Sequence, residues 1–213
     1  DHGRSRRHRG LSSYVEGIGA AMTSPAESMP WPPRLDDLAE VEFSGGLLSR
    51  WSVEEDAAAL LQTAKDPLIR RWNPMPVTTL DDARTLIQTR TTSEDSLSWA
   101  IRGWPGGVLL GALNLFHFEE PVRAVEWGYW IAPAARGRGL AARALLAAAD
   151  FVFTEWAGNR LLLFHAVPNQ ASCRVAVKAG MTLEGHLRQS YKYGDGTVYD
   201  EHLHAILASD LAR

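Results

Sequence analysis

The alternation of hydrophobic and polar positions divides the chain into short strands and amphipathic helices. Apolar residues recur at every second position in some stretches, which favours strands, and every three or four in others, which favours helices. Ser52 and Thr79 each stand where a side chain can cap a helix. Up to residue 131 the pattern predicts strands at 47–51, 97–102, 108–116 and 125–131, helices at 53–64 and 80–92, and a loop at 66–76.

The second half of the chain continues this pattern with a helix at 140–156, a strand at 160–167, a helix at 170–179 and a hairpin of strands at 181–193 and 197–207. The first of these helices is apolar nearly all round, so we expect it to be buried on more than one side. Gly194-Asp195-Gly196 supplies the hairpin turn. The order of elements predicts an α/β (α+β) fold, with one mixed sheet and helices on both faces.

Composition narrows the class of protein. Hydrophobic residues make up 46% of the chain and charged residues 22%, which is typical of a globular protein. A net charge of −3 and a pI of about 6.2 argue against a nucleic-acid partner. The sequence contains no run of 18 apolar residues that could cross a membrane, and no signal peptide. We therefore expect a cytoplasmic protein with neither a nucleic-acid nor a membrane partner.

The N-terminal segment, residues 1–33, differs from the rest. It begins with clustered arginine and histidine and continues with glycine, serine, alanine and proline. Such a segment has too few apolar groups to offset the entropy of ordering. We expect residues 1–33 to be a disordered tail or an expression-derived segment, with a native start at Met22 or Met29. A basic nucleic-acid-binding arm is the alternative. Residues 34–213 are expected to form a single domain.

The spacing of histidine and cysteine gives no metal motif. Cys173 is the one cysteine, so neither an intrachain disulfide nor a cysteine zinc cage can form. His202 and His204 alternate in a strand, where both would point to one face, and packing or surface roles are favoured over a metal. We expect no bound metal and a buried structural thiol at Cys173.

The most informative motif is Arg136-Gly137-Arg138-Gly139-Leu140-Ala141-Ala142, between a predicted strand and a predicted helix. Glycines let the backbone close around a ligand, and the N–H groups and dipole of a helix start attract an anion. Arg136 and Arg138 add charges suited to phosphate, so the expected ligand is a pyrophosphate. A plain turn is one alternative. A dinucleotide fingerprint is another, but no acid closes the next strand.

This Arg-x-x-Gly-x-Ala pattern resembles the acyl-CoA signature of the GNAT family of N-acetyltransferases, whose fold has the same order of elements. A second stretch, from Asn169-Gln170-Ala171-Ser172 to Met181, resembles the Asn-x-x-Ser … Lys-x-Gly-Phe helix of the ribosomal-protein N-terminal acetyltransferases (the RimJ/RimL-like subgroup). Tyr199-Asp200-Glu201 also fits that subgroup. The resemblance covers residues 45–210. It implies a mostly antiparallel central sheet in which the strands at 125–131 and 160–167 splay apart.

The resemblance also implies that acetyl-CoA is the acyl donor. The pyrophosphate would bind backbone N–H groups of the glycine-rich turn, and the pantetheine would lie along the strand near Trp130. Ser172 is expected to donate to the CoA sulfur, although a serine in a first helical turn can also serve the helix alone. The expected CoA-binding residues are Trp130, Ile131, Arg136, Gly137, Arg138, Gly139, Leu140, Ala141, Ala142, Asn169 and Ser172.

Glu126 is the expected general base. It is an acid in an otherwise aromatic and apolar strand, where burial would raise the pKa of its carboxyl group. An outward-facing glutamate is the alternative reading. His117 is the next candidate for the base, whereas His165 is expected to pack in the core or to touch the pantetheine.

The acceptor pocket is expected from residues 66–77, the second helix and the hairpin near Gly194. These regions carry acids, which favour a cationic amine, either a peptide or protein N-terminus or a small molecule. The acids are Glu119, Glu120, Asp195, Asp200 and Glu201. Tryptophans near loops and outer strands predict an exposed aromatic patch and a homodimer, unless they pack under loops. They are Trp31, Trp51, Trp72, Trp99 and Trp104.

Together these features predict an acetyl-CoA-dependent N-acetyltransferase that moves the acyl group from the CoA thioester directly to a primary amine. Ser172 and Glu126 are its expected catalytic residues. Two alternatives stay open. One is a non-catalytic domain that binds or senses acyl-CoA. The other is a dinucleotide-binding reductase.

Overall fold

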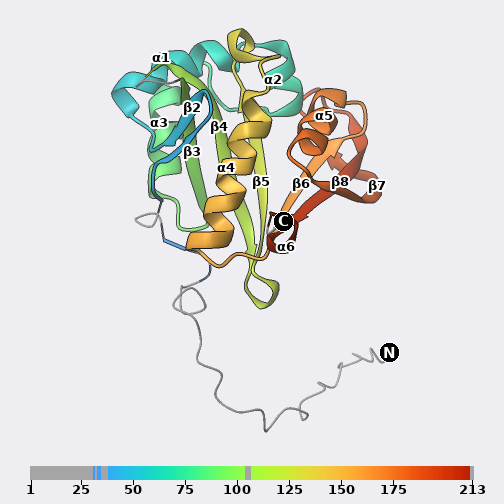
Figure 1. Ribbon diagram of the computed structural model, residues 1–213. Coiled ribbons are helices and arrows are strands. Elements are labelled where there is room, and N and C mark those ends of the chain that lie inside the picture. The colour runs from blue at the N-terminus through green and yellow to red at the C-terminus, as the bar shows by residue number, and fades with distance from the viewer. Residues whose placement is uncertain (1–30, 32, 35–37, 104–106, 212–213) are drawn as a thin grey trace, which may run out of the picture.

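The computed structural model describes residues 31, 33–34, 38–103 and 107–211, which form one eight-stranded sheet with helices on both faces (Figure 1). The strands lie in the order β1-β2-β3-β4-β5-β6-β8-β7. They are β1 Val41–Phe43, β2 Gly46–Ser49, β3 Ser96–Gly103, β4 Leu109–Glu119, β5 Ala124–Ile131, β6 Arg160–Ala166, β7 Thr182–Lys192 and β8 Val198–Leu207. All neighbours are antiparallel except β5 and β6, which are parallel. The predicted mixed, mostly antiparallel sheet is therefore confirmed.

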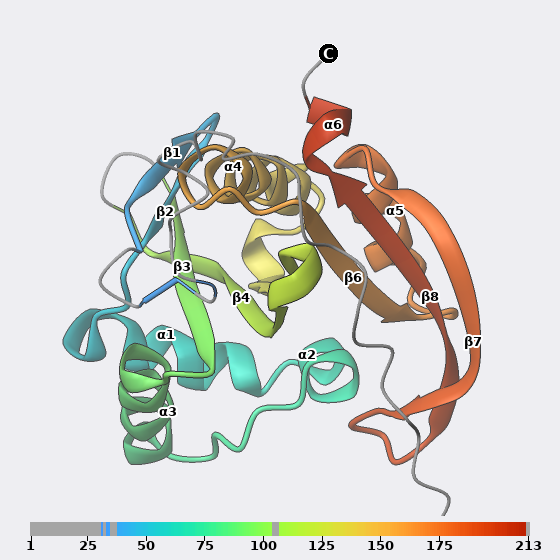
Figure 2. The ribbon, with the colours of Figure 1, turned by 90° about the horizontal axis from the view of Figure 1, so that it is seen from below.

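Helices cover the two faces of the sheet in separate groups (Figure 2). They are α1 Val53–Ala64, α2 Pro67–Trp72, α3 Leu80–Thr92, α4 Leu140–Glu155, α5 Gln170–Lys178 and α6 Ala208–Leu211. Under α4 and α5 lies a core that includes Trp99, Trp127 and Leu145. A second core under α1, α2 and α3 includes Leu60 and Ile87. None of the described helices is long and apolar enough to cross a membrane.

A short helix replaces part of the loop predicted at 66–76. Asp66 caps α2, since its carboxylate accepts hydrogen bonds from the N–H groups of Leu68 and Ile69 at 3.1 and 3.0 Å. Pro67 takes the first helical position, where its missing N–H costs nothing. The local signal was an aspartate before a proline, but six residues are too few to show a helical period. The sequence likewise gave no signal for β1.

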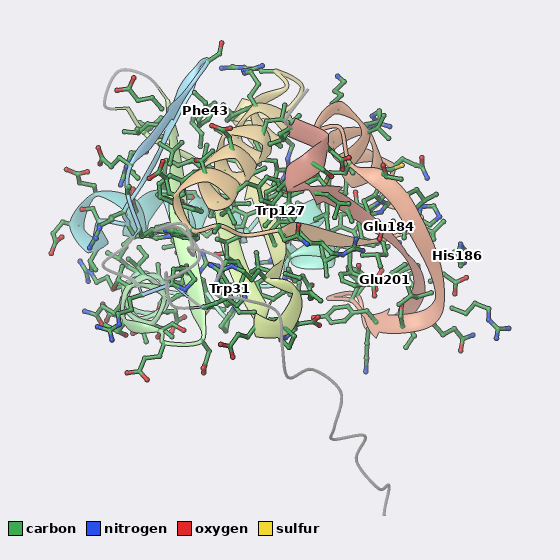
Figure 3. All side chains as sticks on the ribbon, turned by 60° about the horizontal axis from the view of Figure 1, so that its bottom comes forward. Trp31, Phe43, Trp127, Glu184, His186 and Glu201 are labelled. Atoms are coloured by element: carbon green, nitrogen blue, oxygen red, sulfur yellow. The ribbon has the colours of Figure 1, made fainter. Side chains whose placement is uncertain are left out.

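The folded part of the chain includes Trp31, which was assigned to the predicted tail. Trp31, which Figure 3 labels, is 8% exposed, and its indole packs edge-on against Phe118 with ring centroids 5.5 Å apart. The guanidinium of Arg123 lies 5.0 Å from the same ring. Residues 1–30 and 32 lie outside the described part, so the disorder predicted for them stays a prediction. Trp31 therefore packs against the sheet although it belongs to the segment predicted as a tail, and the boundary at residue 34 stays a prediction.

A chain that begins at Arg34 is therefore expected to be less stable than one that begins at Pro30. The shorter chain loses the buried indole of Trp31, and removing a large core side chain costs about 3 kcal/mol. Denaturant unfolding of the two chains measures the difference. Trp31→Ala in the longer chain should reproduce most of it. Equal unfolding midpoints for all three would show that Trp31 adds nothing to the core.

Candidate active site

A cavity of about 570 Å³ opens where β5 and β6 separate. The two strands pair only from Ala124 with Arg160 to Glu126 with Leu162, and beyond that point their ends diverge. The cavity is lined by the far end of β5, the start of α4, the end of β6, the start of α5, and α2. The predicted splay between these two strands is confirmed, and it leaves the polar backbone edge of β5 facing a space large enough for a ligand arm.

The glycine-rich turn forms one wall of the cavity and begins α4. Gly137 and Gly139 have φ values of +76° and +70°, a backbone conformation that favours glycine. Gly139 is the N-cap residue, and no side chain caps α4. The first N–H groups of a helix have no intrahelical acceptor, so those of Leu140, Ala141 and Ala142 are available to an anion in the cavity. This geometry fits the predicted pyrophosphate site.

The two arginines of the turn lie differently from expectation. Arg136 binds the Asp66 carboxylate, with its two terminal nitrogens 2.7 and 3.3 Å from the oxygens, and donates from Nε to the Ile131 carbonyl. The Arg136 hydrogen bond lowers the pKa of Asp66 below its usual range. Arg138 is absent from the described residues that line the cavity. Arg136 thus holds α2 against the turn. A phosphate contact by either guanidinium stays a prediction.

Ser172 lies at the start of α5 and lines the cavity. Asn169 caps that helix, since its side-chain oxygen accepts from the Ser172 N–H at 3.3 Å, as predicted for Asn169. The Ser172 hydroxyl instead meets Tyr129 from β5, whose hydroxyl donates to Ser172 Oγ at 3.2 Å. Burial raises the pKa of Tyr129 to about 12, so Tyr129 keeps its proton at neutral pH. The cap is therefore Asn169, and Ser172 presents a hydroxyl to the cavity.

Glu126 does not meet Ser172. It lies on β5, two residues from Gly128, but it is not among the described residues that line the cavity. Its carboxylate accepts from Nδ1 of His117 at 2.9 Å, and the His117 side chain is 77% exposed. Partial burial raises the pKa of Glu126, the hydrogen bond from His117 opposes that rise, and the nearby Glu201 adds to it. Glu126 has the raised pKa of a candidate base without direct access to the cavity.

The hairpin between β7 and β8 is held against α2. Arg71 of α2 binds Asp195 at 2.9 Å and donates to the Tyr199 hydroxyl at 2.6 Å. The Gly194 N–H donates to the Arg71 carbonyl, and a Cβ at Gly194 would lie 1.9 Å from the carbonyl oxygen of Arg70. This close contact requires glycine. Residues of α2 and Tyr193 at the end of β7 line the cavity, whereas no described residue of α3 does, so the acceptor region predicted from these segments stays a prediction.

Most of the predicted acids in this region are already paired. Asp195 binds Arg71, and Asp200 binds His186 at 2.8 Å. Glu201 is buried, and it accepts from the hydroxyls of Tyr193 at 2.7 Å and Ser190 at 2.9 Å. Figure 3 labels Glu201 and His186 on the outer strands β8 and β7. Tyr193 lines the cavity, so Glu201 contacts a lining residue without lining the cavity itself. Glu119 is the last residue of β4, and Glu120 begins the turn that follows it.

The tryptophans give little support to an exposed patch. Trp31, Trp51 and Trp99 are at most 8% exposed, and Trp72 lines the cavity. Trp104 lies outside the described residues. The described tryptophans are therefore packed in the interior or line the pocket, which was the alternative to an exposed patch. The homodimer stays a prediction, but an exposed aromatic patch no longer supports it.

Sequence reasoning missed two polar groupings. The first joins the hydroxyl of Tyr129 to Ser172, 43 positions away. The helix and strand that carry these residues are separate in sequence, so only their packing reveals the pair. The second grouping places His165, Cys173, His202 and His204 within 4.8 Å of one another.

Comparison with known proteins agrees with this geometry. Residues 47–182 match the acetyltransferase (GNAT) domain. The chain is 26% identical over 165 residues to the uncharacterized N-acetyltransferase YoaA of Bacillus subtilis (strain 168), which covers 76% of this chain and 93% of YoaA. It is 31% identical over 101 residues to the putative ribosomal N-acetyltransferase YdaF of the same organism, which covers 47% of this chain and 55% of YdaF.

The fold is shared with solved structures of the same kind. RimL, a ribosomal L7/L12 alpha-N-protein acetyltransferase in complex with coenzyme A, has a TM-score of 0.71 at 21% identity, over 79% of this chain and 98% of RimL. The family match spans both the glycine-rich turn and the helix that carries Ser172. The chain therefore belongs to the GNAT family of acetyltransferases, and among its relatives are ribosomal N-acetyltransferases, as its motifs predict.

Proposed function

We propose that this enzyme transfers the acetyl group of acetyl-CoA directly to a primary amine in the cavity between β5 and β6. The observation that carries the proposal is the pairing of an uncapped α4 start with a buried hydroxyl pair, Ser172 and Tyr129, in one cavity. The first suits a pyrophosphate and the second suits a departing thiolate. The pantetheine arm would span the cavity from the start of α4 to the hydroxyl pair, beside the edge of β5 at Trp130 and Ile131.

In the proposed reaction the amine nitrogen attacks the thioester carbonyl carbon, and the bond from that carbon to sulfur breaks. Ser172 keeps its proton and donates a hydrogen bond to the thiolate as it leaves, and the released thiolate takes a proton from solvent. Tyr129 donates to Ser172 Oγ, so the hydrogen bond fixes the serine oxygen and directs the serine proton away from Tyr129. Backbone N–H groups of β5 can bind the carbonyl oxygen as negative charge develops on it. The amine gives up its own proton to a base.

We infer that Glu126 is that base and acts through a water, because it lies outside the cavity lining. A base must be deprotonated, so activity is expected to fall as pH drops through the raised pKa of Glu126. Glu126→Gln keeps the size of the side chain and removes its basicity. The expected result is a lower kcat and the loss of this acidic limb from the profile of kcat/KM against pH.

His117→Gln tests the same assignment of Glu126 by the direction in which the acidic limb moves. The hydrogen bond from His117 lowers the pKa of Glu126, so its removal should move the acidic limb to higher pH. A base elsewhere would leave the limb where it is in both variants. An unchanged limb in Glu126→Gln would exclude Glu126, and the next candidate for the base would be His117 itself or water.

The acceptor is proposed to be a peptide or protein N-terminus, with a small-molecule amine as the alternative. YdaF is named a putative ribosomal N-acetyltransferase, and RimL, which shares the fold, is named a ribosomal L7/L12 alpha-N-protein acetyltransferase, which supports the first. The acids near the hairpin are paired with Arg71 and His186, which weakens the argument for a polycationic small molecule. A homodimer and a cytoplasmic location remain predictions.

A further inference from the structure

Three histidines and the one cysteine of the chain converge beneath α5. His165 on β6 lies opposite His202 on β8, and His204 follows on the same face of β8. Cys173, on α5, completes the group. One ligand atom from each of the four residues lies within 4.8 Å of all the others. The antiparallel pairing of β6 with β8, with α5 packed on them, therefore assembles a set of side chains that no sequence spacing displays.

Four ring nitrogens of this cluster are buried without a geometric hydrogen bond to the protein. They are Nε2 of His165, Nδ1 of His202 and both ring nitrogens of His204, although the Met181 backbone lies close to His204. His165 and His204 are each 2% exposed. A buried polar atom without a partner destabilises a core, so four together are a large penalty. Such a penalty indicates that something else satisfies them.

The state of the imidazoles suits metal binding. Nδ1 of His165 lies 2.9 Å from the Ala166 carbonyl, and a donor there leaves the lone pair of Nε2 directed at the cluster. Neutral rings with free lone pairs are the form that a metal requires.

We propose that His165, Cys173, His202 and His204 bind one transition-metal ion of the zinc class in a tetrahedral site. Three imidazole nitrogens and one thiolate are the ligands that Zn²⁺ prefers, whereas Mg²⁺ and Ca²⁺ require oxygen. Tetrahedral zinc distances place ligand atoms about 3.3–3.7 Å apart, so side-chain shifts of about 1 Å close the site. On binding, Cys173 releases its thiol proton to solvent. The inference reverses the sequence-based expectation of no metal.

The proposed role of the ion is structural. Four protein ligands fill a tetrahedral shell and leave no open position for substrate. The site joins α5 to β6 and β8, and Cys173 is the residue after Ser172. His165 also lines the cavity. The ion would therefore fix the helix start that presents Ser172, without touching the reacting atoms. This binding site is independent of which amine the enzyme acetylates.

The test uses the full chain and metal binding rather than activity. After chelator treatment, titration with Zn²⁺ is expected to show one site per chain with a Kd of about 1 µM or tighter, and a rise in melting temperature. Titration with Co²⁺ is expected to give the ligand-field bands of a tetrahedral ion and a thiolate-to-cobalt charge-transfer band. No zinc binding by the folded wild-type chain tighter than about 1 mM would overturn the proposal.

Two variants identify the ligands. Cys173→Ser should remove the thiolate band, and His204→Asn should weaken zinc binding by about 100-fold or more. His117→Gln is the control, because that exposed histidine binds Glu126 and lies outside the cluster. Wild-type cobalt spectra that lack a thiolate band, or that persist unchanged in Cys173→Ser, would place the metal elsewhere and overturn the assignment. Because the wild-type titration is decisive alone, a variant that fails to fold leaves the test valid.

Discussion

Gly139→Val is expected to weaken acetyl-CoA binding by about 10- to 100-fold, which corresponds to a loss of roughly 1–3 kcal/mol of charge-assisted hydrogen bonding. Gly139 has φ of +70°, where a β-branched residue is strained, and its Cβ would lie 3.0 Å from a terminal nitrogen of Arg143. That arginine donates to the Arg138 carbonyl and so shapes the turn. Moving the turn misdirects the N–H groups at the start of α4. Calorimetry with CoA measures the loss.

Gly180→Val is the matched control for backbone strain. Gly180 has φ of +74°, and no atom lies within 4 Å of the Cβ that valine would add. It ends α5, away from the glycine-rich turn. We expect a similar loss of stability in the two variants but a loss of CoA affinity only in Gly139→Val. Unchanged CoA binding by a folded Gly139→Val would contradict the assignment of the pyrophosphate to this turn.

Ser172→Ala is expected to lower kcat by about 100-fold while CoA binds nearly as before. A donor to the leaving thiolate is needed most in the transition state, where negative charge on sulfur is greatest, so its loss appears in kcat rather than in binding. Steady-state kinetics at saturating acetyl-CoA, together with calorimetry, separate the two effects.

Tyr129→Phe distinguishes the serine from its partner. The phenyl ring keeps the packing of β5 and removes the 3.2 Å hydrogen bond to Ser172 Oγ. A smaller fall in kcat than in Ser172→Ala is expected, since the serine hydroxyl remains. Ser190→Ala serves as a hydroxyl-deletion control, because Ser190 binds Glu201 rather than the cavity pair. Wild-type kcat in Ser172→Ala would show that the thiolate is stabilised by another group.

Most of the fold follows from local patterns. The helix predicted from Thr79 runs from Leu80 to Thr92, and its cap is formed by Thr79 and Asp82 together. The long apolar helix begins at Leu140, as predicted. Its residues are apolar nearly all round because the helix is buried on several sides. The missed elements were short. β1 has three residues and α2 has six, and neither is long enough to display a period.

The candidate site was predictable where it depends on one continuous segment. The glycine-rich turn and Asn169 carry their geometry in neighbouring residues, so the motif and the structure agree. Contacts between distant segments were not predictable. The ion pair of Arg136 with Asp66 joins positions 70 residues apart, and the bond of Tyr129 to Ser172 joins two layers of the fold. Sequence gives the charge of each side chain, but packing decides what that charge faces.

The most direct test of the central claim is a thiol-release assay with acetyl-CoA and a panel of amines. The panel should hold peptides with different N-terminal residues, polyamines and aminoglycosides, and mass spectrometry should identify the acetylated product. The account predicts CoA release in equal amount to acetylated amine for at least one class, at a rate that Ser172→Ala and Gly139→Val both reduce. Acetyl-CoA binding without release above the Ser172→Ala rate for any amine would contradict it and favour an acyl-CoA-sensing domain.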